Sequence, residues 1–416
     1  MTCRRLLLTF SVIAVGVSNA THGFHFEEAT IASIHHGFNN GSLTSVALIR
    51  YYLDQIARLN PLLHAVIEVS PDALLDAARA DAERASRHRR ATAGGLHGIP
   101  VLLKDLIATR DRLNTTAGSF ALLGSVVRRD AGVVARLRRA GAVVLGKTNL
   151  PEPLCRTVAD AVHVLDAIVG YDALDAEATR AASKYIPTGG YKQFLNIDGL
   201  RGKRIGIPNG FFGLKNGTVK HRVCKQHIDT MRQHGAIVIE NLDITNLSII
   251  QNITKSGFQA AVPAEFKFNL NNYLSNLSYS PVRSLAEVIA FNNAHPVEEK
   301  LKQYGQQLLL LSENTTGIGP RERAAIHQMT ELSANGVEKL MKKHQLDAIF
   351  TPDSSVTTVL AYNGLPGIEV PAGYDEKGVP FGICFGGLKG YEPRLIEMAY
   401  AFEQATKVRK PPMIKV

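Results

Sequence analysis

The stretches GLHGIPVLLKD, residues 95–105, and GAVVLGKTN, residues 141–149, decide the fold class. Each contains a short apolar run, at 99–103 and at 142–145, that directly follows a glycine. Runs of this length with β-branched residues are typical of buried strands. The residues between them include Val133, Val134 and Leu137 at helical spacing, so the sequence predicts a strand, a helix and a second strand.

This alternation continues along the chain and predicts an α/β fold. We expect Asp130 to cap the helix between the two strands and Gly141 to end it. Nearer the N-terminus, we expect Asn60-Pro61 to stop the helix 43–57. Residues 246–307 are polar and helical in pattern, like a lid beside the core. One large domain, residues 21–416, with a mixed β-sheet core covered by helices is therefore expected. The other expected helices are 43–57, 71–90, 157–169, 218–234 and 393–406, and the other expected strands are 63–69, 203–207, 236–240, 348–350, 367–370 and 381–385.

Residues 1–20 have the pattern of a secretory signal peptide. Arg4 and Arg5 precede the apolar run 6–17, and Ser18-Asn19-Ala20 supplies a small-residue cleavage site. We therefore expect a secreted protein, and no later run is long and apolar enough to predict a membrane span. Sequons for N-glycosylation agree with export; they lie at Asn40, Asn114, Asn216, Asn246, Asn252, Asn276 and Asn314.

Composition argues against several classes of function. The net charge is +10, and basic residues cluster at 84–90 and 128–139. Both clusters lie on alanine-containing helical patterns, and the chain has no tryptophan. These features favour solvent-exposed helix faces over a nucleic-acid-binding surface. Cys155, Cys224 and Cys384 are scattered and allow at most one disulfide. No Cys-x-x-Cys pair or zincin histidine pair is present, so we expect neither a metal nor a cofactor. No pattern specifies an oligomeric state.

Lys104 is the residue whose position calls for a chemical explanation. It ends an apolar strand, where a charged lysine is costly unless it is paired or its pKa is lowered. Two interpretations stay open on this pattern alone. Either the ammonium pairs with Asp105 or another acid, or the amine is neutral and acts as a general base.

Around Lys104 the sequence resembles the amidase signature family, and the secreted fungal-type members most of all. The resemblance covers nearly the whole chain after residue 20. It is carried by 43–45, 59–61, 95–105, 115–119, 130–131, 141–149, 156–160, 281–285, 291–296, 364–368 and 370–374.

The resemblance implies a serine hydrolase of small amides with a Ser–cisSer–Lys triad. Lys104 matches the family lysine, which takes a proton from a serine in a cis peptide and thereby activates the nucleophilic serine. Backbone N–H groups of a glycine/serine-rich loop hold the oxyanion. Ser119 matches a supporting loop residue, and Leu106 replaces a residue that is often polar in the family.

The sequence departs from the family between Leu150 and Arg156. In the family several dozen residues follow Gly-Lys-Thr-Asn-Leu, and they carry both catalytic serines and central strands of the sheet. Here only Pro151 to Cys155 intervene, so we interpret about 150–156 as the site of a deletion. No Ser-x-x-Lys or Gly-x-Ser-x-Gly replaces the lost serines. Ser119 and Ser354-Ser355 are weak substitutes, and Cys384 reads as a core residue.

Two hypotheses follow for the chain as written. The first is an amidase-family hydrolase that lost its central segment through an incorrect exon boundary, leaving the chain inactive. The second is a non-catalytic secreted binding or structural relative on the remaining scaffold. The retained Lys104 and residues 115–119 favour the first.

Overall fold

Two separate β-sheets form the framework of the molecule. The computed structural model describes residues 23–86, 95–149, 155–212 and 217–414. The first sheet has the order β1-β3-β2, with β2 parallel and β1 antiparallel to β3, and the second has the order β5-β4-β6-β8-β7 with both kinds of pairing. The expected α/β fold with mixed sheets is confirmed. The strands are β1 (Val66–Val69), β2 (Pro100–Lys104), β3 (Val143–Thr148), β4 (Arg204–Pro208), β5 (Ile237–Leu242), β6 (Ala348–Pro352), β7 (Gly367–Tyr374) and β8 (Pro380–Gly386).

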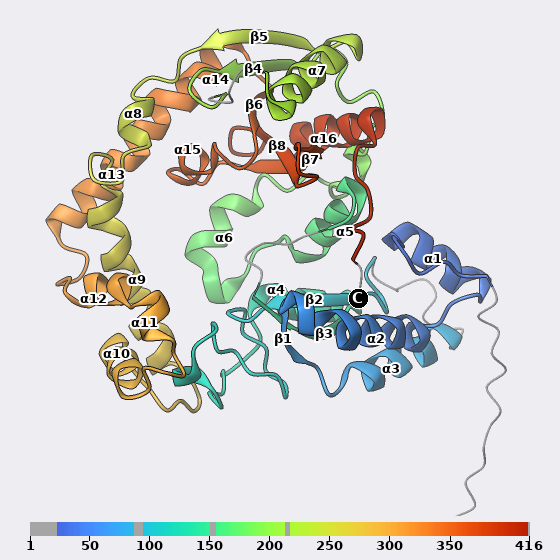
Figure 1. Cartoon of the computed structure of the whole chain (residues 1–416), viewed down its shortest axis with the longest axis vertical. Coiled ribbons are helices and arrows are strands. Elements are labelled where there is room, and N and C mark those ends of the chain that lie inside the picture. The colour runs from blue at the N-terminus through green and yellow to red at the C-terminus, as the bar shows by residue number, and fades with distance from the viewer. Residues whose placement is uncertain (1–22, 87–94, 150–154, 213–216, 415–416) are drawn as a thin grey trace, which may run out of the picture.

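Helices cover both sheets and connect them (Figure 1). In chain order the helices are α1 (Ile31–Asn40), α2 (Ser45–Leu63), α3 (Ala73–Ala85), η1 (Phe120–Leu122), α4 (Gly132–Arg139), α5 (Val158–Ile168), η2 (Ala173–Asp175), α6 (Ala176–Ser183), η3 (Lys192–Phe194), α7 (Val219–Gln233), α8 (Leu247–Ile250), α9 (Phe258–Ser275), α10 (Leu285–Ala294), α11 (Leu301–Tyr304), α12 (Gln307–Glu313), α13 (Pro320–Ser333), η4 (Ala334–Glu338), α14 (Lys339–His344), α15 (Thr357–Ala361) and α16 (Glu392–Thr406). Helices α7 and α16 pack on β7, whereas α3 packs on β3. Within the described ranges every helix is too short or too polar to span a bilayer.

Helix α5 joins the cores of the two sheets. Thr157 caps it, because its hydroxyl accepts a hydrogen bond from the Asp160 amide at 3.0 Å. Val162 belongs to the core beneath the five-stranded sheet, which contains Phe350 and Phe385. Ile168 packs instead against the core of the three-stranded sheet. One apolar helix therefore contributes to both hydrophobic cores.

The helices α8–α12 form a lid that returns the chain to the three-stranded half. Leu274 and Leu277, from and beside α9, pack with Leu122 of η1 in one apolar cluster. A backbone bridge between Val126 and Tyr279 adds hydrogen bonds to this contact. The two halves therefore touch at α5 and again at the lid, and Figure 1 shows the resulting ring.

Several expected boundaries are wrong for local reasons. Helix α2 continues through Pro61 to Leu63. Because proline has no N–H, the last turn loses only one hydrogen bond, and the His64 amide still donates to the Asn60 carbonyl at 2.8 Å. Ala131, not Asp130, precedes α4 as its N-cap. Helix α3 ends at Ala85, where Ser86 is extended, and residues 87–90 of the expected helix lie outside the described residues. The expected signal peptide and most of the 150–156 junction lie outside the described residues.

Candidate active site

Lys104 lies at the carboxyl end of β2, next to the end of β3. It is in register with Thr148, and the amide of Asp105 donates to the Thr148 carbonyl at 2.9 Å. The Lys104 side chain is half-buried and makes no hydrogen bond or ion pair with any residue that the structure describes. The parallel pairing of two strands thus holds an unengaged amine at a strand end, where α/β enzymes place functional groups.

Asp105 does not neutralise Lys104, because its carboxylate holds the following loop. This carboxylate is buried and accepts hydrogen bonds from the Thr116 hydroxyl, from the Thr116 amide at 3.3 Å and from the Gly118 amide at 3.3 Å. The loop turns here through left-handed backbone at Ala117 and Gly118. Asp105 therefore does not pair with Lys104, and no other described acid forms an ion pair with it.

Ser119 faces the lid. Its hydroxyl donates to Glu299 Oε1 at 2.9 Å and accepts from the Ala121 amide at 3.2 Å. Glu299 also accepts from the Phe120 amide at 2.8 Å. Ser119 thus caps η1 and links it to the lid, in keeping with its match to a supporting loop residue rather than to a nucleophile.

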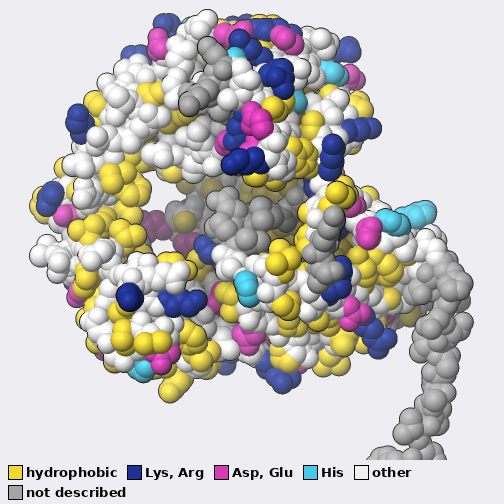
Figure 2. All heavy atoms as spheres, in the orientation of Figure 1, with side chains coloured by type: hydrophobic (Ala, Val, Ile, Leu, Met, Phe, Trp, Pro, Cys, Tyr) yellow, Lys and Arg dark blue, Asp and Glu magenta, His cyan; other side chains and the backbone are white. Residues whose placement is uncertain are grey.

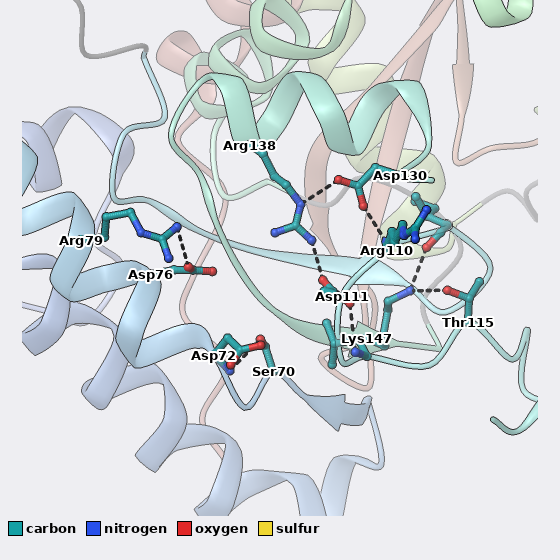
Figure 3. Close-up of polar contacts among 12 residues, drawn as sticks. Ser70, Asp72, Asp76, Arg79, Arg110, Asp111, Thr115, Asp130, Arg138 and Lys147 are labelled. Atoms are coloured by element: carbon teal, nitrogen blue, oxygen red, sulfur yellow. Dashed lines mark hydrogen bonds and ion pairs between the residues drawn. The ribbon is translucent and has the colours of Figure 1, made fainter. Parts of the chain in front are cut away.

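The sequence patterns did not single out Lys147, which is completely buried in β3. Its ammonium donates to the Ile107 carbonyl at 2.8 Å and to the Thr115 hydroxyl at 3.0 Å (Figure 3). Burial lowers the pKa of Lys147, and the nearby charges of Asp105 and Asp111 oppose this shift only in part. The available sequence signal was its place directly after the apolar run 142–145, and the structure buries the strand β3 at every position.

Lys147 and a group of ion pairs together fix the loop that follows Lys104. Arg138 bridges Asp111 at 2.5 Å and Asp130 at 3.0 Å. Asp130 also accepts from the Arg110 amide at 2.6 Å (Figure 3). These contacts explain why Asp130 is not a helix cap, since its carboxylate already pairs with Arg138 and accepts from the Arg110 amide. They tie α4 and β3 to the same loop that Asp105 holds.

The remaining sequence candidates lie in the other half of the molecule. The Ser355 hydroxyl donates to the Pro352 carbonyl at 2.7 Å, and Ser354 lies beside it after β6. Cys384 is buried in β8, and burial raises the pKa of its thiol to about 12, so the thiol stays protonated near neutral pH. The expectation that Cys384 is a core residue is confirmed. In the described part of the chain no three His, Cys, Asp or Glu side chains converge as metal ligands.

A cavity of about 620 Å³ lies between α5, β7 and α16. Its wall is mostly apolar and includes Val158, Ala161 and Leu165 of α5. Glu392 and Glu403 are its partly buried acids, and burial raises the pKa of both carboxyls. An apolar cavity with a few polar groups has the character of a binding site.

The chain is similar in sequence to known amidases. A family model described as Amidase matches residues 47–154 and 152–362. A protein of Arabidopsis thaliana named as a probable amidase is 45% identical over 506 aligned positions, which cover 98% of this chain and 96% of that protein.

Solved structures agree with this match. The peptide amidase of Stenotrophomonas maltophilia superposes with a TM-score of 0.85 at 30% identity, covering 94% of this chain and 100% of that one. An amidase family protein of Bacillus anthracis superposes with a TM-score of 0.83 at 26% identity, covering 94% and 93%. Fold and site thus define a hydrolase scaffold for carbon–nitrogen bonds. The chain belongs to the amidase family.

Proposed function

We propose that this chain derives from a secreted amidase in which Lys104 is the general base, and that the chain as written does not hydrolyse amides. The observation that carries the proposal is the break in the family match. The match ends at residue 154 and restarts at residue 152, within the stretch where the sequence predicts a deletion of both catalytic serines.

The length of the alignment supports a missing segment. The Arabidopsis alignment has 506 positions, and 98% of 416 residues is about 408, so about 100 positions hold no residue of this chain. That total is large enough to include the several dozen residues that the resemblance leads us to expect. Among the described strands, β2 and β7 each lie at an outer edge of their sheet, which is also what the loss of intervening strands would leave.

The geometry around Lys104 supports its assignment as the base. An amine that accepts a proton must be free of a carboxylate partner and close to a hydroxyl in the reacting state. Lys104 meets the first condition within the described residues, and the Asp105–Thr116–Gly118 hydrogen bonds hold the adjoining loop in place. The second condition fails here, because the candidate Ser119 hydroxyl is directed to Glu299.

In the complete enzyme the chemistry is acyl transfer. Lys104 takes a proton through the cis serine, the nucleophilic serine attacks the amide carbon, and the amine leaves with a proton. Water then hydrolyses the acyl-enzyme. Loss of the nucleophile alone costs on the order of 10⁶ in kcat in the subtilisin example, and the oxyanion-binding loop is lost as well.

The retained site favours the enzyme origin over a non-catalytic binding relative. A scaffold kept only for binding has no need of an unpaired strand-end lysine, yet Lys104 and the loop contacts of Asp105 are in place. The substrate class we propose is a small amide. Cleavage after Ala20 during export is part of the proposal, and N-terminal sequencing of the secreted protein tests it.

Two measurements test the proposal. The first is to sequence the transcript across the codons for Leu150 and Arg156, where a longer product encoding a glycine/serine-rich insert is expected. The second is an amide-hydrolysis assay of the chain as written beside Lys104→Ala, where neither protein should exceed background. Hydrolysis that disappears in Lys104→Ala would show that the chain as written is active and would overturn the proposal.

A further inference from the structure

The N-glycosylation sequons differ in what their side chains do in the folded chain. At Asn114 the side-chain nitrogen Nδ2 donates to both carboxylate oxygens of Glu68, at 3.1 and 3.2 Å, and Oδ1 accepts from the Gly124 amide at 3.1 Å. The hydroxyl of Thr116, the third residue of this sequon, donates to the Asp105 carboxylate in a buried site. An N-linked sugar is bulky and replaces a hydrogen of Nδ2, so a glycan at Asn114 would disrupt these contacts.

Asn314, in contrast, has the side chain that a glycan needs. It is exposed at the end of α12, where its backbone amide donates to the Leu310 carbonyl at 3.1 Å. Its side chain makes no hydrogen bond or ion pair with any residue in the described ranges, and Thr316, which completes the sequon, is also exposed. At Asn276, also in the lid, Nδ2 donates to the Asn272 carbonyl at 2.8 Å and to Asn272 Oδ1 at 2.9 Å. Among these three sequons, Asn314 is therefore the one that can be modified without loss of a side-chain contact.

Helix α9 holds the Asn314 loop beside exposed aromatic side chains. Lys267 Nζ donates to the carbonyls of the residues directly before and after Asn314, at 2.6 and 3.1 Å. Phe266 and Phe268 lie on either side of Lys267 in the sequence of α9 and are 42% and 59% exposed. The modifiable asparagine thus lies next to apolar surface that the lid itself does not cover.

The apolar surface continues on α12, which packs against α9. Leu310 and Leu311 lie one helical turn before Asn314, and both are exposed, as is Leu308. Figure 2 shows hydrophobic side chains on the surface of the lid, at the left of the view. Exposed apolar patches mark a surface that is covered by something else or that promotes aggregation. We call this set the apolar lid surface: Phe266, Phe268, Leu308, Leu310 and Leu311.

We propose that Asn314 carries an N-linked glycan, and that this glycan covers the apolar lid surface and limits self-association there. The co-reactant is an oligosaccharide on a lipid pyrophosphate. Asn314 Nδ2 forms a bond to C1 of the first sugar, the bond from C1 to the pyrophosphate oxygen breaks, and the proton lost from Nδ2 balances the departing lipid pyrophosphate. Because a glycan is bulky and strongly hydrated, it replaces apolar surface with polar surface beside α9 and α12.

The inference rests on the proposed function for one condition, the export of the chain. It goes further, because it assigns the modified residue and the effect of the modification. Neither assignment depends on Lys104 or on catalysis.

The first test is to express the full chain in a eukaryotic secretory host and to map its glycopeptides by mass spectrometry, before and after treatment with a peptide N-glycosidase. We expect a glycan on Asn314 and none on Asn114 in the folded protein. Thr316→Ala should abolish the glycan although Asn314 is still present, and Thr316→Ser, which keeps the hydroxyl, should retain it. N-terminal sequencing of the same sample shows whether residues 1–20 have been removed.

The second test measures the effect on association. Asn314→Gln should raise the light scattering of the concentrated protein about twofold or more, because the apolar lid surface is then uncovered. Adding Phe268→Lys to this variant should reverse the increase. Adding Ile197→Lys, at a residue that is 66% exposed outside the lid, should not reverse it. Circular dichroism confirms that the compared variants are folded.

The outcomes separate this inference from the proposed function. If residues 1–20 are removed and Asn314 is unmodified, the inference is wrong and the proposed export stands. If residues 1–20 are retained and Asn314 is unmodified, both are wrong. If Asn314 is modified but Phe268→Lys and Ile197→Lys act equally, the glycan does not act through the apolar lid surface. Amide hydrolysis that depends on Lys104 would overturn only the proposed function.

Discussion

At the scale of single residues, two lysines in the same region have opposite environments. Lys104 has no side-chain partner among the described residues, whereas Lys147 is completely buried and donates to Ile107 and Thr115. The family resemblance identifies Lys104 as the candidate base. The burial of β3 makes Lys147 notable, because a cation taken out of water must be held by specific acceptors.

Lys147→Met tests the effect of this burial on stability. The folded-state pKa is lowered, so the unfolded chain binds the proton more strongly between that pKa and 10.5. The free energy of unfolding contributed by Lys147 should therefore rise with pH across this window. Denaturant unfolding from neutral to alkaline pH should show wild-type gaining stability relative to the variant. The same slope in both proteins would contradict the prediction, and the exposed Lys302→Met is the control.

Glu392→Gln should show the opposite dependence. Burial raises the folded-state pKa of Glu392 above 4.5, so the folded chain binds the proton more strongly than the unfolded chain. Wild-type stability should fall as pH rises from 4.5 through the raised pKa, and the variant should be more stable than wild-type above that range. Thermal melts across this range measure it, with exposed Glu177→Gln for comparison. A variant that is less stable near neutral pH would refute the assignment.

Ser119→Ala tests the link between η1 and the lid. It removes the hydrogen bond to Glu299 and the cap on the Ala121 amide, which should cost about 1 kcal/mol. The midpoint of denaturant unfolding measures this loss. Ser183→Ala removes an exposed hydroxyl that bonds only within its own helix and should cost less. Equal effects of the two substitutions would show that the Glu299 contact contributes nothing.

At the scale of elements, the sequence predicted the strands better than the ends of helices. The apolar run 381–385 lies within β8, and the run 99–103 overlaps β2 in all but its first residue, because burial itself requires apolar side chains there. The predictions for Asp130 and Pro61 were wrong because sequence spacing does not reveal their surroundings. Asp130 pairs with Arg138 and accepts from the Arg110 amide, and Pro61 lies in the last turn of α2. The loop anchored by Lys147 was missed for the same reason, since its acceptors come from residues far along the chain.

The outer edge of β2, which no described strand covers, should make the chain prone to association. Edge strands with exposed apolar side chains pair readily with other chains, and Leu102 is 42% exposed on this strand. Leu102→Lys should reduce aggregation, as measured by light scattering during concentration. Leu174→Lys changes a more exposed leucine outside either sheet and should have less effect. If Leu174→Lys reduces aggregation equally, general surface hydrophobicity is the cause rather than the strand edge.

At the scale of the whole molecule, the two halves should unfold with poor cooperativity. Each sheet has its own core, and the contacts between them include α5, the lid and the Arg409–Glu28 ion pair. The mostly apolar cavity between α5, β7 and α16 means that few side chains pack directly across this boundary, which weakens the coupling further. We expect broad thermal transitions that differ between near- and far-ultraviolet circular dichroism, with binding of a hydrophobic dye before the main transition. A single sharp transition by both probes would contradict this.

The division of the strands along the sequence has a consequence for the gene. β1, β2 and β3 all lie before residue 150, and β4 to β8 all lie after residue 155. No described strand pairs across that point, so adding or removing whole codons there shifts no strand register in either sheet. An in-frame splicing change at this boundary can therefore alter the protein's length by a large segment while both sheets keep their pairing.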